Sequence, residues 1–536
     1  MVSTTRTTNG ASTTSNVTST KRKFASDDRE EFNAIKRSRK LPQKAKPGTS
    51  ALENHDPNKT SSQIFTPASR LKKPALTKHD TASKTRRSQP TPTHPPLPVI
   101  NEAPTQVLKV IVFGTGECGE LGLGPRAKEV PRPVVNPFLD ASDAGSFPVV
   151  QLDCGGMHTI ALTKDNKIIT WGVNDNGALG RDTTWNSGLR DIDAESDDES
   201  VDLNPLESTP APVPADYFPQ NIKFVQVAAG DSCSFALTDT GRVYGWGTFV
   251  NNEGKTRFIY HNKRAIEVQR KPLLIPGLQN ITQITCGANH ALALDDSGNV
   301  WAWGVGEQNQ LGRRILERRY LESFYPHRVE VCRNNAKYIA SGLYHSFAVD
   351  RKDNVWAWGL NGYCEAGYAK DAGNESSVPA PMKIPDLRGK GVTVLDGGAH
   401  HSAAITADGQ CLVWGRIDGG QLGIEFSREQ LEDDTLIRRD ERNRPRICLR
   451  PTAVVSIGNA VYVGCGTDHT IFVNKEGKAF GAGFGSMGQL GIASCDDAEV
   501  AEQITGKAVK DMMLTWCGAG GQFSIVAAPS GVPNGS

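Results

Sequence analysis

Residues 154–180 read CGGMHTIALTKDNKIITWGVNDNGALG, and residues 286–312 read CGANHALALDDSGNVWAWGVGEQNQLG. Both stretches run from a glycine-containing turn and a histidine through an apolar segment and a polar turn to Trp-Gly, and both close on Leu-Gly. A third stretch repeats this order from Gly398 through Gly415 to Gly423. Short apolar segments separated by turns at such regular spacing predict antiparallel β-strands.

The repeat can be counted by the glycine that ends each Trp-Gly-like segment. The seven glycines are Gly114, Gly172, Gly247, Gly304, Gly359, Gly415 and Gly483, at intervals of 58, 75, 57, 55, 56 and 68 residues. A period of about 56 residues, with insertions after the second and sixth copies, predicts an all-β protein with seven blades of about four strands, a seven-bladed β-propeller.

The two ends of the repeat array are incomplete in complementary ways. The first copy, residues 107–124, has only the end of a repeat, and the last, residues 514–528, has only a beginning. Pairing them would complete one blade and remove the exposed sheet edges, so ring closure by the N- and C-terminal strands is expected. The predicted organisation is a disordered basic tail over 1–106, a propeller over 107–528 and a disordered C-terminus over 529–536.

Charge divides the chain into two parts. The net charge is +1, but residues 1–106 hold 19 Lys and Arg against 8 Asp and Glu, while the remainder holds 41 against 51. A basic arm on an acidic body suggests that the arm binds a polyanion such as nucleic acid. The 11 cysteines include no C-x-x-C pair, and no apolar run of about 18 residues or signal peptide is present, so a soluble intracellular protein without membrane contact is expected.

Two basic clusters in the tail have the spacing of a bipartite nuclear import signal. They are separated by 12 residues and consist of Lys21, Arg22 and Lys23, then Lys36, Arg37, Arg39 and Lys40. Such clusters fit two acidic grooves on an import carrier. The tail is rich in Ser, Thr and Pro and poor in apolar residues, so we expect disorder and salt-dependent binding to DNA phosphates. Which clusters meet DNA and which meet the carrier is left open.

Two patterns imitate other kinds of site. Gly114, Gly116 and Gly119 match the G-x-G-x-x-G of dinucleotide-binding folds, but Gly483, Gly485 and Gly488 occupy the same repeat register and no helical periodicity follows either set. We interpret these glycines as turns that need positive φ, and no cofactor is expected. The repeat histidines His158, His290, His345, His401 and His469 share one register, so we expect each to bond backbone groups within its own blade.

The G-x-x-H, W-G and G-Q-L-G copies together resemble the regulator of chromosome condensation family, over about residues 107–528. The resemblance implies a guanine-nucleotide exchange factor for the small GTPase Ran, held on chromatin in the nucleus, acting as a monomer and catalysing no covalent chemistry. Exchange of this kind needs only that the factor bind the nucleotide-free GTPase more tightly than the loaded one.

The third copy loses the usual closure and has residues 248–258, TFVNNEGKTRF, in its place. This segment resembles the family's β-wedge, a hairpin that inserts at the GTPase nucleotide site. The resemblance assigns the wedge to Thr248, Phe249, Asn251, Asn252, Glu253, Gly254 and Lys255.

Further positions are assigned by the same resemblance. The expected GTPase-binding residues are Glu117, Asp231, Asn289, Arg313 and His400, and His400 is singled out because it stands next to the repeat histidine. Asn289 departs from the family's Asp, and an amide hydrogen-bonds without charge. Arg318 and Arg319 lie in a loop over 313–319 that resembles the family's loop on the nucleosome acidic patch, which the forked arginine side chain suits.

Two insertions receive no function: an acidic one at 191–207, expected to be a disordered loop, and a charged one at 424–446. The main alternative is a propeller scaffold for another protein partner, because one fold serves many functions. Exchange rate and GTPase selectivity do not follow from the sequence.

Overall fold

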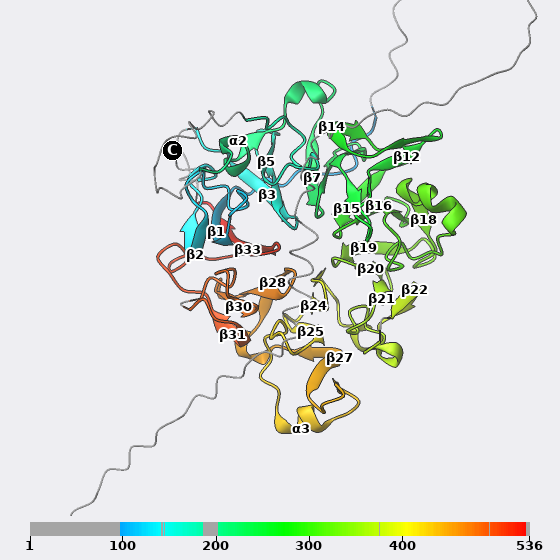
Figure 1. Ribbon diagram of the computed structural model, residues 1–536, viewed down its shortest axis with the longest axis vertical. Helices are drawn as coiled ribbons and strands as arrows, with labels where there is room; N and C mark the ends of the chain where they lie inside the picture. Colours follow the sequence, from blue (N-terminus) through cyan, green and yellow to red (C-terminus); the bar gives the residue numbers. More distant parts are fainter. Residues whose placement is uncertain are drawn as a thin grey trace, which may run out of the picture. The chain divides into compact units, whose positions relative to one another are not determined.

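The computed structural model describes residues 97–140, 143, 145–185, 202–374, 376–492 and 494–531. Seven antiparallel sheets are arranged around a central channel, as the repeat count predicts (Figure 1). The first strand of every blade lines the channel. The all-β, seven-bladed propeller is therefore confirmed.

Blade 1 joins both ends of the propeller. Its strands are β1 (Leu108–Thr115), β2 (Glu129–Val135), β32 (Trp516–Ala519) and β33 (Phe523–Pro529). β1 pairs with β33 over seven positions, from Leu108 opposite Pro529 to Gly114 opposite Phe523. The expected closure of the ring by complementary half-blades is confirmed.

Blades 2 to 4 follow in chain order. Blade 2 comprises β3 (Val149–Cys154), β4 (His158–Thr163), β5 (Ile168–Gly172) and β6 (Ala211–Pro212). Blade 3 comprises β7 (Phe224–Ala229), β8 (Cys233–Thr238), β9 (Val243–Gly247) and β14 (Gln269–Leu274). Blade 4 comprises β15 (Ile281–Cys286), β16 (His290–Asp295), β17 (Val300–Gly304) and β18 (His327–Val329).

Blades 5 to 7 complete the ring. Blade 5 comprises β19 (Ala336–Ser341), β20 (His345–Asp350), β21 (Val355–Leu360) and β22 (Ser377–Lys383). Blade 6 has five strands: β23 (Val394–Gly397), β24 (His401–Ile405), β25 (Cys411–Arg416), β26 (Ile437–Arg439) and β27 (Pro445–Ala453). Blade 7 comprises β28 (Ala460–Cys465), β29 (His469–Asn474), β30 (Ala479–Gly483) and β31 (Ala498–Gln503).

Two hairpins and several short helices decorate the ring. Between β9 and β14 lie β10 (Phe249–Val250) with β11 (Thr256–Arg257), then β12 (Ile259–His261) with β13 (Arg264–Ile266). The α-helices are α2 (Pro205–Ser208) and α3 (Arg428–Glu432). The 3₁₀ segments are η1 (Ala215–Tyr217), η2 (Glu317–Phe324), η3 (Ala369–Asp371), η4 (Pro385–Leu387) and η5 (Val455–Ile457). None of the helices in the described ranges is long and apolar enough to cross a bilayer.

The Trp-Gly and Leu-Gly motifs meet between neighbouring blades. Trp358 is fully buried, and its indole N–H donates to the backbone carbonyl of Gln310 in the preceding blade at 2.8 Å. Trp414 makes the same contact with the carbonyl of Glu365 at 2.9 Å. A buried indole needs a hydrogen-bond acceptor, and the loop that closes the preceding blade supplies it for Trp358 and Trp414.

The expectation that the repeat histidines bond backbone groups of their own blades is wrong. Each imidazole Nε2 lies 2.8–2.9 Å from a hydroxyl of the next blade: His158 with Ser234, His290 with Ser346, His345 with Ser402, His401 with Thr470, and His469 with Ser524. The histidine begins the second strand at the blade boundary, where its side chain is long enough to cross. Burial lowers the pKa of these histidines, to about 3 for His290.

Carboxyl and amide side chains also join blades across the channel wall. Asp153 accepts from the backbone N–H of Ala229 at 2.8 Å, and Asp396 accepts from that of Cys465 at 2.8 Å. Burial raises the pKa of both aspartates to about 7. Gln226 both donates to and accepts from the backbone of Ile284, which ties blade 3 to blade 4.

The glycine-rich segments are turns, with two corrections. Gly114, Gly119, Gly483 and Gly488 have φ between 72° and 112°, as the turn interpretation predicts. Gly116 and Gly485 do not have positive φ; a Cβ would lie 2.7 Å from the Leu121 side chain at 116 and 2.1 Å from the Asp496 carbonyl oxygen at 485. Close packing therefore favours glycine at these two positions.

All 11 cysteines are free thiols, and the four that precede repeat glycines lie in strands that border the channel.

The acidic insertion at 191–207 was expected to be a disordered loop, and this is wrong for its last residues. Asn204 caps α2, and the Glu207 carboxylate accepts a hydrogen bond from the Thr183 hydroxyl at 2.7 Å. Residues 186–201 lie outside the described residues.

Candidate functional site

The predicted GTPase-binding and wedge residues lie in loops on one side of the ring. In each blade the loop after the first strand and the loop after the third strand leave the sheet at the same end, because neighbouring strands are antiparallel. In blade 2, for example, His158 at the start of β4 pairs with Gly172 at the end of β5. We call this side the loop face, and the opposite side, which carries the turns after the second strands, the turn face.

Backbone hydrogen bonds join the loops that follow the first strands. Ala288 N–H donates to the Leu343 carbonyl, Leu343 to Gly398, Ala399 to Thr467 and Thr467 to Gly520, over 2.9–3.3 Å. Two more bonds run from Asp231 to Ala288 and from Gly521 to Gly156, both at 2.9 Å. Because this belt fixes the loops of Asp231, Asn289 and His400, the polar groups on the loop face are held in place before any partner binds.

The segment expected to be a wedge forms the hairpin of β10 and β11. Phe249 pairs with Arg257, and Val250 pairs with Thr256. The base is rooted in the core: Thr248 and Phe249 are fully buried, and the Phe249 ring stacks 6.1 Å from Phe258. The Thr248 hydroxyl donates to the Glu267 carbonyl at 2.6 Å, which fixes the point where the hairpin leaves blade 3.

The tip of this hairpin is exposed and organised by Asn251. The Asn251 carboxamide oxygen accepts from the backbone of Glu253 at 3.1 Å and of Lys255 at 2.8 Å. Gly254 has φ of 75° and open space around the position of a Cβ. Asn and Gly thus serve turn geometry here. Lys255 and Glu253 form an exposed ion pair at the tip.

Blade 4 braces the hairpin from the side. The Asn289 carboxamide oxygen accepts from the Val250 backbone N–H at 2.7 Å, and Glu307 accepts from the Asn252 N–H at 2.9 Å. Tyr320 in η2 hydrogen-bonds with the Asn251 side chain. The replacement of the family's Asp by Asn at 289 therefore keeps an oxygen acceptor for the hairpin, a contact that the sequence did not reveal.

Asp231 lies one blade before Asn289 in the belt. It is half-buried, and its carboxylate lies against the backbone of Gly156, where a Cβ would approach to within 2.0 Å of a carboxylate oxygen. Glycine at 156 therefore leaves room for the Asp231 carboxylate in this position. The structure thus places Asp231 at the boundary of blades 2 and 3, on the same face as the hairpin.

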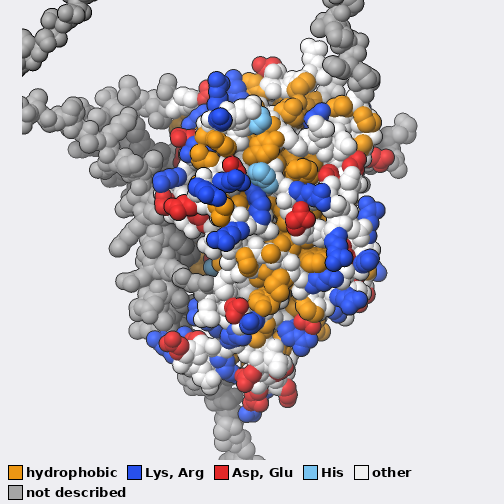
Figure 2. Space-filling view, turned by 90° about the vertical axis from the view of Figure 1, so that its right-hand side faces the viewer, with side chains coloured by type: hydrophobic (Ala, Val, Ile, Leu, Met, Phe, Trp, Pro, Cys, Tyr) orange, Lys and Arg blue, Asp and Glu red, His pale blue; other side chains and the backbone are white. Residues whose placement is uncertain are grey.

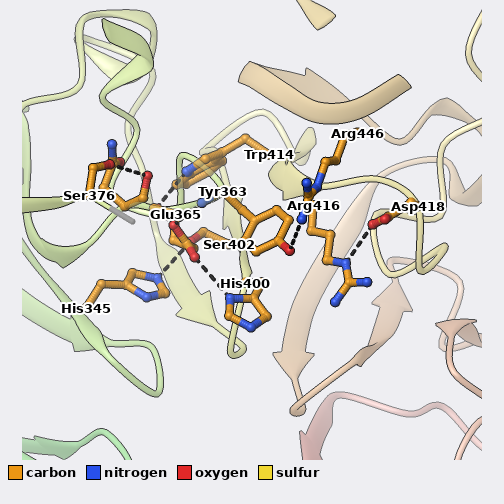
Figure 3. A network of polar contacts seen from close by, with 11 residues as sticks. His345, Tyr363, Glu365, Ser376, His400, Ser402, Trp414, Arg416, Asp418 and Arg446 are labelled. Atoms are coloured by element: carbon orange, nitrogen blue, oxygen red, sulfur yellow. Dashed lines mark hydrogen bonds and ion pairs between the residues drawn. The ribbon is translucent and has the colours of Figure 1, made fainter. Parts of the chain in front are cut away.

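His400 lies on the other side of the ring, in blade 6, and its imidazole is joined to Glu365 in the network of Figure 3. Its Nδ1 lies 3.2 Å from a carboxylate oxygen of Glu365, which is fully buried, whereas the His400 side chain is 32% exposed. Because a carboxylate only accepts, Nδ1 carries the proton, and Nε2 is the nitrogen left for an external partner. The Tyr363 ring packs 4.7 Å from the imidazole. The sequence reasoning missed both Glu365 and Tyr363.

The remaining two predicted GTPase-binding residues, Glu117 and Arg313, differ in how far they are buried. Glu117 is exposed in the turn after β1. Arg313 is half-buried, and burial lowers its pKa to about 10. It occupies the repeat position of Arg181, whose guanidinium donates to the Thr170 carbonyl and hydroxyl within blade 2. That register favours a role for Arg313 inside its blade, and its contact with a GTPase stays a prediction.

The arginine segment is a helix in part, where a loop was expected. Arg318 and Arg319 are exposed at the start of η2, while Phe324 at its end is buried against Phe249. Figure 2 shows the outer edge of the ring that carries β12 and β18, where Lys and Arg side chains are spread with fewer acidic ones among them. The arginines therefore face solvent while η2 supports the hairpin from behind.

The tail reaches the ring on the turn face. Asn101 donates through its side chain to the carbonyls of Thr238 and Ile281, at 3.1 and 2.8 Å, and the backbone of Ile100 donates to Asp239 at 2.8 Å. These contacts precede the predicted start of the propeller at residue 107. The basic clusters at 21–23 and 36–40 lie outside the described residues.

Comparison with known proteins gives consistent matches. The family model described as "RCC1-like domain" matches residues 109–526. "Guanine nucleotide exchange factor SRM1" of Saccharomyces cerevisiae is 39% identical, covering 78% of this chain and 87% of that protein. "Regulator of chromosome condensation" of Mus musculus is 28% identical, with coverages of 78% and 90%.

Solved structures agree with the sequence matches. The crystal structure of Prp20p from Saccharomyces cerevisiae, described with its binding to Gsp1p and histones, aligns with a TM-score of 0.71 at 36% identity, over 80% of this chain and 93% of that one. Yeast RCC1 (Prp20) bound to Kap60 aligns with a TM-score of 0.72 at 35% identity, over 84% and 97%.

Proposed function

Because the chain belongs to the RCC1-like domain family, we propose that it is a guanine-nucleotide exchange factor for a Ran-type small GTPase, tethered to chromatin in the nucleus. The single observation that carries the proposal is the hairpin of β10 and β11, which stands on the loop face with a buried base and an exposed tip. The protein would act as a monomer and would make or break no covalent bond.

The hairpin suits displacement of a bound nucleotide because it is held rigidly before contact. Asn289, Glu307 and Tyr320 brace it from blade 4, and the Phe249 ring fixes its base. A preorganised hairpin loses little conformational freedom on insertion, so more of the binding energy is available to favour the nucleotide-free GTPase. That differential affinity lowers the affinity of the GTPase for GDP.

The other loop-face residues would hold the emptied GTPase. Asp231 and His400 stand on loops that the backbone belt connects, and Glu117 is exposed on the same face. We assign these residues and Asn289 to the GTPase interface, and Arg313 remains an assignment by resemblance. Fixed polar groups around the ring would contact the GTPase at several separated points while the hairpin occupies the nucleotide site.

Chromatin attachment would use the basic tail and the exposed arginines of η2. The described chain enters the ring on the turn face at Ile100 and Asn101. The basic tail before it would bind DNA phosphates. Arg318 and Arg319 on the outer edge would contact the nucleosome acidic patch. The clusters at 21–23 and 36–40 would bind an import carrier, a proposal supported by the Kap60 complex of yeast RCC1.

Release of fluorescent GDP from a Ran-type GTPase tests the exchange activity. The variant replaces residues 251–255 by two glycines, and the matched control replaces residues 262–263, at the tip of the neighbouring hairpin of β12 and β13, by two glycines. We expect the first variant to lose at least about a hundredfold of the rate acceleration, with its melting temperature preserved. The control should keep the wild-type rate. Equal rates for wild type and wedge variant would reject the wedge, and no acceleration by wild type would favour the scaffold alternative.

A further inference from the structure

The charged insertion at 424–446 is a folded extension of blade 6 that reaches blade 5. It contains α3, which begins with a capping box formed by Ser427 and Gln430, and β26, which pairs with β27. Arg438 donates to the carbonyl of Ala372 in blade 5. At the base of the insertion, Ile447 and Leu449 pack with Cys364 and Ala372. Polar and apolar contacts together thus fix the insertion on the loop that follows β21.

The insertion places Arg446 against Tyr363. The Arg446 Nη2 donates to the Tyr363 hydroxyl at 2.8 Å, and its guanidinium carbon lies 5.1 Å from the ring centroid. The Arg446 carbonyl accepts from the backbone of Ile417 at 2.9 Å, which fixes the point from which the side chain leaves. Figure 3 shows Arg446 and Arg416 on the side of Tyr363 away from His345. A half-buried tyrosine in a loop thereby gains a fixed ring orientation.

Tyr363 is in turn one of two groups that orient His400. Its ring lies 4.7 Å from the imidazole, and Glu365, two residues later, accepts from Nδ1 at 3.2 Å. The same Glu365 carboxylate accepts from the Tyr363 backbone N–H at 2.9 Å. The aromatic ring limits rotation of the imidazole while the carboxylate selects its tautomer, so both leave Nε2 directed outward.

Arg416 also lies over the Tyr363 ring, but its side chain is bound by a residue other than the tyrosine. Its guanidinium is 5.3 Å from the ring centroid, but its Nε is bound by Asp418 at 2.6 Å. Its backbone N–H donates to the His400 carbonyl at 2.9 Å. Arg416 is therefore committed to its own blade, and Arg446 is the arginine that hydrogen-bonds the tyrosine hydroxyl.

We propose that Arg446 and Tyr363 are positioning residues through which the blade 6 insertion holds the His400 imidazole for contact with the GTPase. This inference rests on the proposed function for its kinetic consequence, but the imidazole orientation it describes exists in the free protein. It gives the charged insertion a role in the exchange reaction without direct contact with the GTPase.

The first arm of the test observes His400 in the free protein. The imidazole ¹H–¹³C signal of His400 is assigned by its loss in H400N and compared among wild type, R446A and Y363F at one pH. We expect R446A and Y363F to shift it in the same direction. The control R442A removes an exposed arginine of the same insertion and should leave the signal in place. An unchanged signal in R446A would overturn the proposal.

The second arm measures kcat and KM for GDP release. R446A and Y363F should each lower kcat about fivefold, with KM within about twofold, because the Arg446–Tyr363 hydrogen bond that fixes the tyrosine ring beside the imidazole is lost. In the H400A background neither should lower kcat further. An additive loss in that background would mean that Arg446 contacts the GTPase directly, and would overturn the positioning role. If wild type fails to release GDP, the proposed function falls, whereas the NMR arm still decides whether Arg446 positions His400.

Discussion

The carboxamide oxygen of Asn289 accepts a hydrogen bond from the backbone N–H of Val250 at 2.7 Å, so that a residue of blade 4 holds the hairpin that grows from blade 3. The hairpin has only two residue pairs of its own, which is too little for independent stability. Its conformation therefore depends on this bond and on the buried ring beneath it.

Asn289→Ala should loosen the hairpin without unfolding the ring. The Val250 N–H loses its acceptor, at a cost of about 1–2 kcal/mol, so hydrogen exchange of that amide should accelerate and GDP release should slow by about tenfold. Asn289→Asp keeps an oxygen at the same place and should behave like wild type in the exchange measurement. Unaltered protection of Val250 in the alanine variant would show that the bond does not hold the hairpin.

Phe249→Ala removes the buried base of the same hairpin. The ring is fully buried and stacks on Phe235 and Phe258 at 6.2 and 6.1 Å. Its loss should lower the free energy of unfolding by about 3–4 kcal/mol, measured by urea denaturation. Val250→Ala, at the half-buried neighbouring position, serves as control and should cost less than about 1.5 kcal/mol. Similar losses for both variants would contradict the packing described here.

Acid should destabilise the propeller through its inter-blade histidines. Burial lowers their folded-state pKa to about 3–4, so the unfolded chain binds protons below its own pKa near 6.5 while the folded ring does not. Stability is therefore present above pH 6.5 and is lost as pH falls, by about 2 kcal/mol per histidine at pH 5. The two channel aspartates, with pKa raised to about 7, act in the opposite sense but are fewer.

Urea midpoints measured between pH 8 and pH 5 check this dependence. Wild type should lose stability steadily below pH 6.5. The His290→Gln variant should be less stable than wild type at pH 8 because the bond to Ser346 is disturbed. Its free energy of unfolding should then fall less steeply with decreasing pH, because glutamine does not take up a proton in the unfolded chain. The same decline in both proteins would mean that His290 does not contribute to the acid response.

Asn101→Ala should weaken the attachment of the entering chain to the turn face. The side chain bridges the carbonyls of Thr238 in blade 3 and Ile281 in blade 4, so its loss should cost about 1–2 kcal/mol. Limited proteolysis should then cut faster near residues 97–106, while GDP release, which we propose to take place on the loop face, stays at the wild-type rate. A slower release would show that the two faces are coupled.

The sequence predicts the regular positions of the ring well because each of them occurs in several copies of the repeat. Seven strand-ending glycines gave seven blades, and the incomplete first and last copies gave the closing blade. The hydrogen bond between His290 and Ser346 of the next blade was not predictable in this way. The repeat shows that each copy has a histidine at this position, but it does not show that the histidine's partner lies in a different copy.

Contacts between insertions were equally hidden. Arg446 and Tyr363 are 83 positions apart, and neither belongs to a motif that names the other. Arg313 shows what resemblance leaves out: it is half-buried and shares its repeat register with Arg181, whose guanidinium bonds within its own blade, while its contact with a GTPase stays a prediction. Comparing each candidate with its counterparts in the other copies would have separated structural arginines from exposed ones.

The pairing of β1 with β33 also fixes when the molecule can be completed during synthesis. Leu108 lies opposite Pro529, so the last hydrogen bonds of the ring wait until β33 has left the ribosome. Until then β1 presents an unpaired edge while the later blades are still being made, and such edges attract other chains. Loss of β33 would therefore leave β1 with an unpaired edge and remove the closure of the first blade along with the last strand.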